Sequence, residues 1–306
     1  MHQLWVEKYR PKSIAEYIFY TTTHKEQFKK MIQEKWIPHL LLYGSPGVGK
    51  TTLARVLINE LALDPTDTLT INASDENNIE TIRTKIISFV STYANGPFKV
   101  VFLDEADYIS QPGQGVLRKV LEDFSDSARF ILAGNYAHKF IPAVRSRCQE
   151  FTFKALDKEK ILEYVVDMLD AEKIRFDLAV LKKYVDVAYP DIRKTVNLLQ
   201  QNSINGVLVD VAGQTGASDY KFQLLDLLEQ DKWIEIRKLV CENVTGEEWE
   251  DMYRFLYDNL KNTKKFKEQS KWDAGTCIIA EYLYKHGLCA DSEINFAACI
   301  IRLGQI

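Results

Sequence analysis

The stretch HLLLYGSPGVGKT, from His39 to Thr51, decides the fold of this 306-residue chain. HLLLY is typical of a short buried strand, and GSPGVG is typical of a glycine-rich turn. The amphipathic residues from Lys50 to about Leu63 predict a helix. The GxxxxGK[ST] spacing between a strand and a helix indicates a phosphate-binding loop. A chance glycine-rich turn is the alternative, and the strand, the Lys-Thr pair and the helix together speak against it.

Strand-like and helix-like segments alternate over the first half of the chain. Four more apolar runs are strand-like, at residues 68–72, 99–103, 129–133 and 150–153. Helical patterns over 78–93 and around 117–124 lie between them, so we predict an α/β fold with a parallel sheet covered by helices on both faces. After Phe153 the strand signal disappears, and the sequence predicts three or four helices to about Gly206 and more helices over 220–306.

The loop residues define a nucleotide site. Glycines let successive backbone N–H groups surround phosphate oxygens, and the helix N-terminus favours negative charge. Lys50 is expected to reach the β- and γ-phosphates of ATP, and the Thr51 hydroxyl to bind Mg²⁺. The predicted phosphate-binding residues are Gly44, Ser45, Pro46, Gly47, Val48, Gly49, Lys50, Thr51 and Thr52.

Polar residues follow two later strands. VVFLDEAD, residues 100–107, places Asp104 and Glu105 at the end of a strand, where open parallel sheets bind ligands. Asp104 is expected to hold Mg²⁺ and Glu105 to orient the attacking water, while Asn135 after the next strand is a candidate γ-phosphate sensor. The alternatives are a solvated acidic turn and a turn-forming Asn.

Composition narrows the class of protein. The chain is 46% hydrophobic and 27% charged, as in globular proteins, and its net charge of −4 excludes a uniformly basic DNA-coating protein. No apolar run approaches the roughly 20 residues needed to span a bilayer, and no secretory signal is apparent. Five cysteines without CxxC pairs indicate reduced thiols, so we expect a cytoplasmic protein that does not bind membranes.

Seven motifs occur in an order that resembles sliding-clamp-loader ATPases. They are WVEKYRP (5–11), GSPGVGKT (44–51), NASDE (72–76), FLDEAD (102–107), LAGN (132–135), SRC (146–148) and PDIRKT (190–195). The chain is similar to the small subunits of replication factor C, and most similar to the ATPase subunit of T-even bacteriophage clamp loaders. EKYRP together with SRC is the most specific part of this resemblance, which covers about 5–199.

The resemblance implies three domains. These are an AAA+ ATPase core at 1–154, a helical lid at 155–212 and a helical collar at 213–306 that joins subunits into a five-membered ring. The polar segment GQTGASD, residues 213–219, is the best candidate for a linker before the collar.

The resemblance also implies roles in the nucleotide site. Arg193 of PDIRKT would reach the γ-phosphate as a second sensor, and Arg147 of SRC would enter a neighbouring subunit's ATP site in trans as an arginine finger. Without the resemblance, Arg193 is one charge on a basic helix face, and WVEKYRP is an extended arm with an aromatic anchor. The resemblance assigns no role to Arg145, for which we expect either a surface charge or a local ion pair. The residues implied to frame the adenine are Val6, Glu7, Lys8, Tyr9 and Ile18.

Contacts with DNA and clamp follow from the same likeness. The implied DNA phosphate contacts are Arg83, Arg118 and Lys119, and Gln114 would couple DNA contact to the DEAD strand. In TYANGPF, residues 92–98, Tyr93 and Phe98 would be apolar contacts to the sliding clamp. The alternatives are exposed faces of amphipathic helices and an ordinary turn.

We therefore predict the ATPase subunit of a sliding-clamp loader that uses ATP and Mg²⁺. Its expected partners are a sliding clamp, primer–template DNA, copies of itself and a distinct loader subunit, in the cytoplasm of an infected bacterial host if the phage likeness holds. The alternatives are another AAA+ remodeller such as a helicase loader, or a non-hydrolysing ring subunit. A DEAD helicase would need a second motor domain, for which the C-terminal third offers no motif.

Overall fold

The computed structural model describes residues 3–75, 79–210, 220–244 and 249–306, with the backbone alone at 79–83. The described chain forms two compact units, one of residues up to 168 with 190–197, the other of 169–189 with 198 onwards. The predicted linker at 213–219 and the predicted boundary after residue 212 lie outside the described residues, so the division into three domains stays a prediction.

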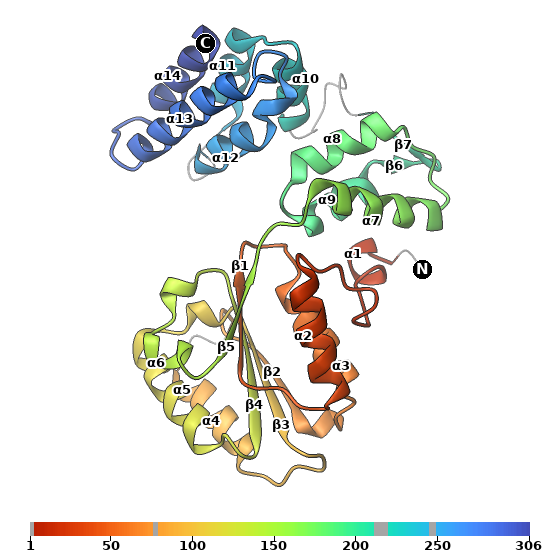
Figure 1. The fold of residues 1–306 in the computed structure, drawn as a ribbon, viewed down its shortest axis with the longest axis vertical. Helices are drawn as coiled ribbons and strands as arrows, with labels where there is room; N and C mark the ends of the chain where they lie inside the picture. Colours follow the sequence, from red (N-terminus) through yellow and green to blue (C-terminus); the bar gives the residue numbers. More distant parts are fainter. Residues whose placement is uncertain (1–2, 76–78, 211–219, 245–248) are drawn as a thin grey trace. The chain divides into compact units, whose positions relative to one another are not determined.

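The first unit contains a five-stranded parallel sheet (Figure 1). Its spatial order is β2-β3-β4-β1-β5, which places the strand of the phosphate loop beside the last strand of the sheet. The strands are β1 (Leu40–Gly44), β2 (Thr68–Asn72), β3 (Lys99–Asp104), β4 (Ala128–Gly134) and β5 (Gln149–Phe153). All five lie within two residues of the predicted runs, and the predicted α/β fold is confirmed.

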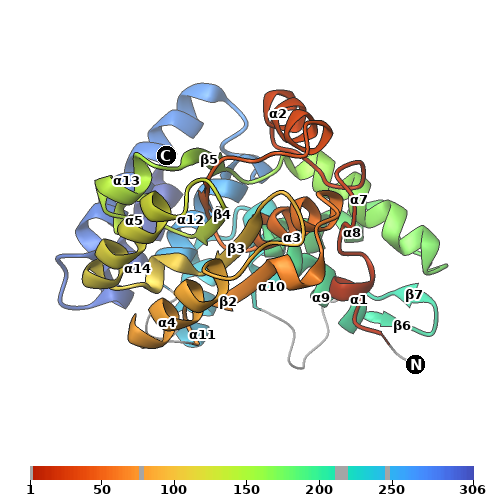
Figure 2. The ribbon, with the colours of Figure 1, turned by 90° about the horizontal axis from the view of Figure 1, so that it is seen from below.

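Helices cover both faces of this sheet. Figures 1 and 2 show α2 and α3 on one side of the strands and α4, α5 and α6 on the other. The helices with residues in this unit are α1 (Trp5–Lys8), α2 (Thr22–Gln33), α3 (Lys50–Glu60), α4 (Ile79–Val90), α5 (Gln111–Asp123), α6 (Pro142–Arg145), α7 (Lys158–Ala171) and α9 (Ile192–Gln201). The layered arrangement explains why the strands are apolar on both faces.

Each face of the sheet has its own hydrophobic cluster. Phe102 packs with Phe28 of α2 and Leu53 of α3 on one face, while its neighbour Leu103 packs with Leu117 of α5 on the other. Successive strand residues point to opposite faces, so β3 supplies both clusters in turn. Because β3 is buried from Lys99 to Leu103, its position is fixed, and the position of Asp104 at its end follows.

The N-terminal motif WVEKYRP differs from the expected extended arm. Trp5 to Lys8 form the single turn α1, and Trp5 is buried, as expected of an aromatic anchor. The turn closes with the backbone N–H of Tyr9 donating to the carbonyl of Trp5. An isolated turn is marginal in water, so its packing, and not its propensity, stabilises it.

The second unit is helical, as predicted. Its helices are α8 (Leu178–Ala188), α10 (Lys221–Glu229), α11 (Trp233–Asn243), α12 (Trp249–Asn259), α13 (Gln269–His286) and α14 (Ser292–Gln305), with the ends of α7 and α9. Phe296 lies at the centre of its core, with ring centroids 5.1 Å from Tyr253 and 5.7 Å from Trp249.

One small sheet contradicts the expectation that strands end at Phe153. β6 (Ser203–Ile204) and β7 (Val207–Leu208) form an antiparallel hairpin, closed by Asn205 and Gly206 with φ of 52° and 77°. Two consecutive positive φ values are typical of the tight turns that Asn-Gly favours. Two-residue strands are too short to produce an alternating pattern, so no sequence signal predicts them.

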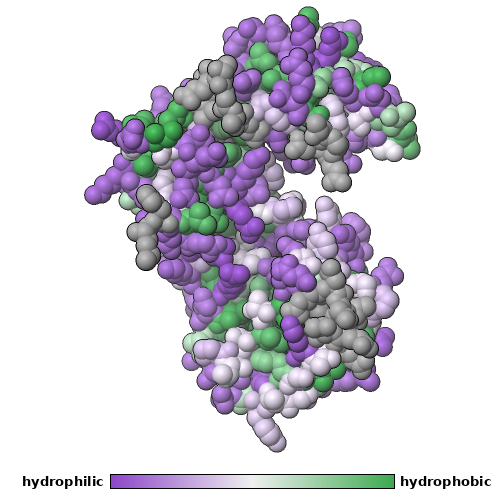
Figure 3. All heavy atoms as spheres, turned by 180° about the vertical axis from the view of Figure 1, so that it is seen from behind, coloured by the Kyte–Doolittle hydropathy of each residue, from purple (hydrophilic) through white to green (hydrophobic). Residues whose placement is uncertain are grey.

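Among the described helices, none is long and apolar enough to cross a membrane. Hydrophilic residues cover most of the face drawn in Figure 3, with hydrophobic residues in small groups between them.

Candidate nucleotide-binding site

The phosphate loop connects β1 to α3, and two of its glycines adopt the left-handed backbone conformation. Gly47 and Gly49 have φ of 73° and 94°, values that other residues adopt at a cost of about 1–2 kcal/mol. A Cβ at Gly47 would also lie 2.1 Å from Oδ1 of Asp191, so the loop has no space for a side chain there. No side chain caps the N-terminus of α3 at Gly49, which leaves its first N–H groups available to an anion.

Lys50 is buried at the start of α3. Its ammonium donates to the carbonyls of Gly44 at 2.7 Å and Ser45 at 2.8 Å, and to Oδ1 of Asn135 at 2.9 Å. Burial lowers the pKa of Lys50 to about 8, while the carboxylates of Asp107 and Asp104 act in the opposite direction. Three protein acceptors thus hold the cation at the loop, where phosphate oxygens can take their place.

The structure places the two predicted magnesium ligands side by side. The Thr51 hydroxyl donates to Oδ1 of Asp104 at 3.0 Å, and burial raises the pKa of that carboxyl. Hydroxyl and carboxylate oxygens suit Mg²⁺, which nucleotide sites hold through one or two carboxylates together with phosphates. The Thr51 and Asp104 oxygens therefore fit a Mg²⁺ ion whose other ligands would be phosphate oxygens and water.

Glu105 and Asn135 flank this pair. Glu105 has φ 53° and ψ 35°, a conformation that is rare for Glu, and its backbone N–H donates to Oδ1 of Asp104 at 3.1 Å. Strained residues of this kind concentrate at functional sites. Asn135 follows β4 and reaches Lys50 from the neighbouring strand end, so the predicted sensor does lie at the phosphate loop.

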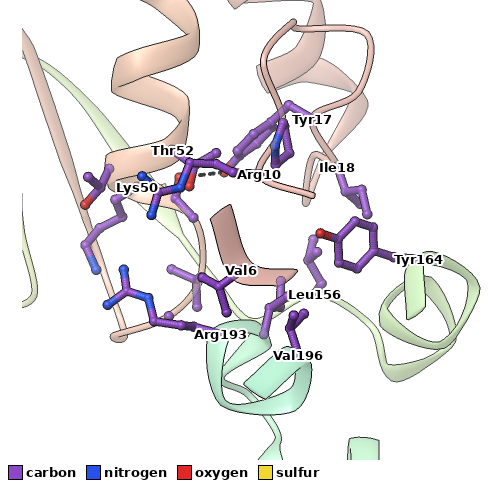
Figure 4. A pocket seen from close by; sticks show the side chains of 16 residues that line it. Val6, Arg10, Tyr17, Ile18, Lys50, Thr52, Leu156, Tyr164, Arg193 and Val196 are labelled. Carbon is purple, nitrogen blue, oxygen red and sulfur yellow. Dashed lines mark hydrogen bonds between the residues drawn. The ribbon is translucent and has the colours of Figure 1, made fainter. Parts of the chain in front are cut away.

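A pocket with two different sides opens beside the loop (Figure 4). The basic ends of Lys50 and Arg193 lie on one side, and Ile18, Leu156 and Val196 lie on the other. A triphosphate fits the basic side and an adenine ring the apolar side. Besides loop residues 47–52, the pocket is lined by Val6, Arg10, Pro11, Tyr17, Ile18, Leu156, Tyr164, Ile192, Arg193 and Val196.

The pocket contains part of the predicted adenine frame. Val6 and Ile18 line it, whereas Glu7, Lys8 and Tyr9 are not among the lining residues. Glu7 is exposed and pairs with Arg10, and the Lys8 ammonium lies 5.2 Å from the ring centre of Tyr9. In a single helical turn only one side faces inward, so four consecutive residues could not all face the base.

Sequence reasoning missed several lining residues. Arg10 and Pro11 complete the EKYRP motif that drew attention to this segment, and Leu156 follows directly after the last strand. Tyr164 donates to the carbonyl of Tyr9 at 3.0 Å, and burial raises its pKa to about 12. Tyr17 donates to the carbonyl of Gly49 at 3.2 Å. An isolated Tyr in a helix or loop carries no sequence signal for such a position.

The two arginines of AVRSRC have different surroundings. Arg145 forms two hydrogen bonds of 2.9 Å to Glu150, which confirms the expected local ion pair. Arg147 donates to the carbonyl of Ala143 at 2.6 Å and pairs with Glu122, and its side chain is 31% exposed. It does not line the pocket of its own chain, so any role at an ATP site requires another subunit.

Gln114 is buried and fully hydrogen-bonded. Its amide nitrogen donates to the carbonyls of Ile109 and Lys139 at 2.9 Å each, and its oxygen accepts from the N–H of Ile141 at 2.8 Å. It therefore connects the segment after the DEAD strand with the segment after Asn135. This position suits coupling, although the Gln114 side chain has no exposed surface for DNA in this structure.

The predicted DNA contacts lie on two helices. Arg118 and Lys119 are exposed on α5, as phosphate contacts must be. Arg83 belongs to α4, but its side chain lies outside the described residues. DNA binding by these residues stays a prediction.

The two predicted clamp anchors do not share an environment. Tyr93 is 101% exposed, whereas Phe98 is 3% exposed and packs in the core beside α2 and α3. A fully buried ring cannot contact a partner without unfolding its own core, so the structure corrects the expectation for Phe98. Tyr93 remains the candidate.

Comparisons with known proteins agree with this geometry. Residues 40–156 match the AAA family, described as ATPase family associated with various cellular activities. A replication factor C small subunit of Sulfurisphaera tokodaii is 40% identical over 98% of this chain and 94% of that protein, and one of Methanococcus vannielii is 32% identical over 99% of each. Thermotoga maritima RuvB, a Holliday junction branch migration motor, has a TM-score of 0.57 at 16% identity, over 83% of this chain and 80% of that one, which shows the fold alone.

Proposed function

The chain belongs to the family of replication factor C small subunits, clamp-loader AAA+ ATPases, and we propose that it loads a sliding clamp onto primer–template DNA. ATP binding opens the clamp and holds it at the junction, and hydrolysis, stimulated by DNA and clamp, releases the closed clamp. The observation that best supports this proposal is that Lys50, Asn135 and the Thr51–Asp104 pair gather at one phosphate loop.

Each of these residues has a chemical task in the proposed reaction. Lys50 and the N–H groups of α3 bind the phosphates, and Thr51 and Asp104 hold Mg²⁺, which when bound neutralises phosphate charge. Glu105 orients the attacking water and Asn135 contacts it or the γ-phosphate. Since positioning and charge stabilisation account for most of phosphoryl transfer, these groups supply most of a working site.

Two arginines supply the remaining positive charge. Arg193 reaches the γ-phosphate from α9 as a second sensor, an assignment supported by its place beside Lys50 in the pocket. Arg147 serves the ATP site of a neighbouring subunit, since it lies outside its own pocket. A guanidinium brought in trans is worth about 10³–10⁵ in rate in related NTPases.

The proposed assembly is a five-membered ring of copies of this chain with one distinct subunit, joined by the helical second unit as a collar. Arg83, Arg118 and Lys119 contact DNA phosphates without reading sequence, and Gln114 couples that contact to the DEAD strand. Tyr93 contacts the clamp. The likeness to T-even phage loaders suggests the cytoplasm of an infected bacterium as the place of action.

The direct test is the ATPase rate of the assembled loader, measured with clamp and primer–template DNA, separately and together. We expect each ligand to raise the rate and the two together to raise it most. A rate indifferent to both ligands would reject the clamp-loader proposal and leave an ATPase of another kind.

A further inference from the structure

The segment between α4 and β3, residues 91–98, is held by two buried charges. Asp67 is 1% exposed and Lys99 is 3% exposed, so both charged groups lie inside the first unit. Both make hydrogen bonds to this segment or to the end of α4 beside it. Burying a charge is costly unless hydrogen bonds compensate for it, so these contacts call for an explanation.

Asp67, from the 3₁₀ turn before β2, holds the second half of the segment. One carboxylate oxygen accepts from the N–H of Asn95 at 3.1 Å, and the other accepts from the N–H of Gly96 at 2.7 Å. The Asn95 amide also donates to the Thr66 hydroxyl at 3.0 Å. Two backbone N–H groups, those of Asn95 and Gly96, are thereby fixed to the 3₁₀ turn that precedes β2.

Lys99 holds the first half. Its ammonium donates to the carbonyl of Phe89 at 2.8 Å and to the Thr92 hydroxyl, and lies 4.6 Å from the centre of the Phe89 ring. Phe98 fixes the segment's end in the core, with the Arg129 guanidinium 5.4 Å from its ring centre. The segment is therefore attached on both sides of Tyr93.

Tyr93 points away from all of these attachments. Tyr93 is 101% exposed, so burial of its ring contributes nothing to the stability of this chain. The backbone is nevertheless held in place on both sides of Tyr93. An exposed aromatic residue on a backbone that is already ordered binds a protein at lower entropic cost, because the backbone has little freedom left to lose.

We propose that Asp67 and Lys99 are positioning residues that preorganise Tyr93 for contact with the sliding clamp. The identity of the partner rests on the proposed function, whereas the preorganised segment rests on the hydrogen bonds above. Lys99 begins β3 and Asp104 ends it, so the same rigid strand connects the contact segment to the nucleotide site.

A double-mutant cycle tests this proposal. Affinity for labelled cognate clamp is measured for the assembled loader with a non-hydrolysable ATP analogue and no DNA. Tyr93→Ala should weaken binding about 10- to 100-fold, as expected of an aromatic hot spot, and Asp67→Asn should weaken it several-fold. In the Tyr93→Ala background, Asp67→Asn should change affinity less than about twofold, because its effect acts through Tyr93.

Further measurements separate positioning from folding. Hydrogen exchange should show the Asn95 and Gly96 amides protected in the wild type and exposed in Asp67→Asn. Lys99→Met keeps the aliphatic stem and provides a second variant if Asp67→Asn does not fold. Gln27→Ala, which removes an exposed side chain of α2 in the first unit, should leave clamp affinity unchanged.

The outcomes distinguish this inference from the proposed function. Equal losses from Asp67→Asn with and without Tyr93 would overturn the inference while the clamp-loader function stands. A wild-type loader that does not bind the clamp would overturn both the partner assignment and the proposed function. Unprotected Asn95 and Gly96 amides in the wild type would overturn the preorganised segment itself.

Discussion

Among the described residues, the first unit has four buried charged side chains, Lys50, Asp67, Lys99 and Asp107, whereas in the second unit Asp186 alone is both charged and buried. Lys50 follows the phosphate loop, Lys99 begins β3, and Asp107 lies in the 3₁₀ turn shortly after β3. A buried charge is retained where its position matters, because an apolar residue would stabilise the fold as well or better.

The two units also differ in the apolar side chains that they expose to solvent. In the first unit they are mainly single aromatics such as Trp36, Tyr93 and Tyr136, while the second unit exposes aliphatic residues such as Ile234, Leu288 and Ile294. This contrast agrees with the position of the nucleotide site, whose residues all belong to the first unit.

Two core substitutions that lower the free energy of unfolding by similar amounts can show which unit determines nucleotide binding. Phe102→Ala in β3 and Phe296→Ala in α14 each remove a fully buried ring, so each should destabilise its own unit by about 3–5 kcal/mol. Denaturation followed in parallel with nucleotide titration should show that only Phe102→Ala also weakens nucleotide binding. Equal losses of affinity from both would contradict the separation.

Lys50→Ala tests the chemistry of the first unit alone. Removing one preorganised donor to the reacting group costs about 10²–10³ in rate, which corresponds to about 2.7–4 kcal/mol. We expect a loss of ATPase activity of that order without a change in helical content. Lys238→Ala, at an exposed position of α11, is the matched control and should keep full activity.

Gly47→Ala should have a smaller effect on the same site. The left-handed backbone costs an Ala about 1–2 kcal/mol, and the new methyl would meet the Asp191 carboxylate. Calorimetric titration should show nucleotide affinity lowered about tenfold. Asp191→Ala in the same chain should restore part of the loss by relieving the contact, and a complete absence of rescue would show that Asp191 does not restrict the loop.

Arg145→Ala should have the smallest effect of the series, and it should depend on pH. Hydrogen bonds from Arg145 lower the pKa of Glu150, so the pair stabilises the fold above the ordinary Glu pKa and loses that effect as the pH falls through the lowered value. Unfolding midpoints of variant and wild type should therefore differ slightly at pH 7 and converge at pH below about 4. A difference that persists in acid would mean that packing, not charge, is responsible.

The sheet was predictable because its strands are runs of five to seven residues, rich in apolar and β-branched side chains and separated by helical patterns. Residues 68–72 were predicted as a strand and form β2, whereas the hairpin at 203–208 has strands too short for any pattern. Strand order was not predicted, since local sequence does not specify which strands become neighbours.

The site was predictable where a motif ties residue type to spacing. Lys50, Thr51 and Asp104 belong to such motifs, and the structure brings them together. Phe98 was misplaced because an aromatic residue in a turn can face either solvent or core, and spacing does not distinguish the two. Arg10 and Tyr164 line the pocket only through tertiary packing, which leaves no local pattern.

We propose that a second copy of this chain completes the ATP site through Arg147. The most direct measurement mixes subunits carrying Arg147→Ala with subunits carrying Lys50→Ala, each inactive alone, and follows ATP hydrolysis in the presence of clamp and DNA. We expect the mixture to regain activity, because a Lys50→Ala neighbour presents Arg147 to a site with intact Lys50. If both variants assemble and no mixing ratio restores hydrolysis, the completion of the site in trans is contradicted.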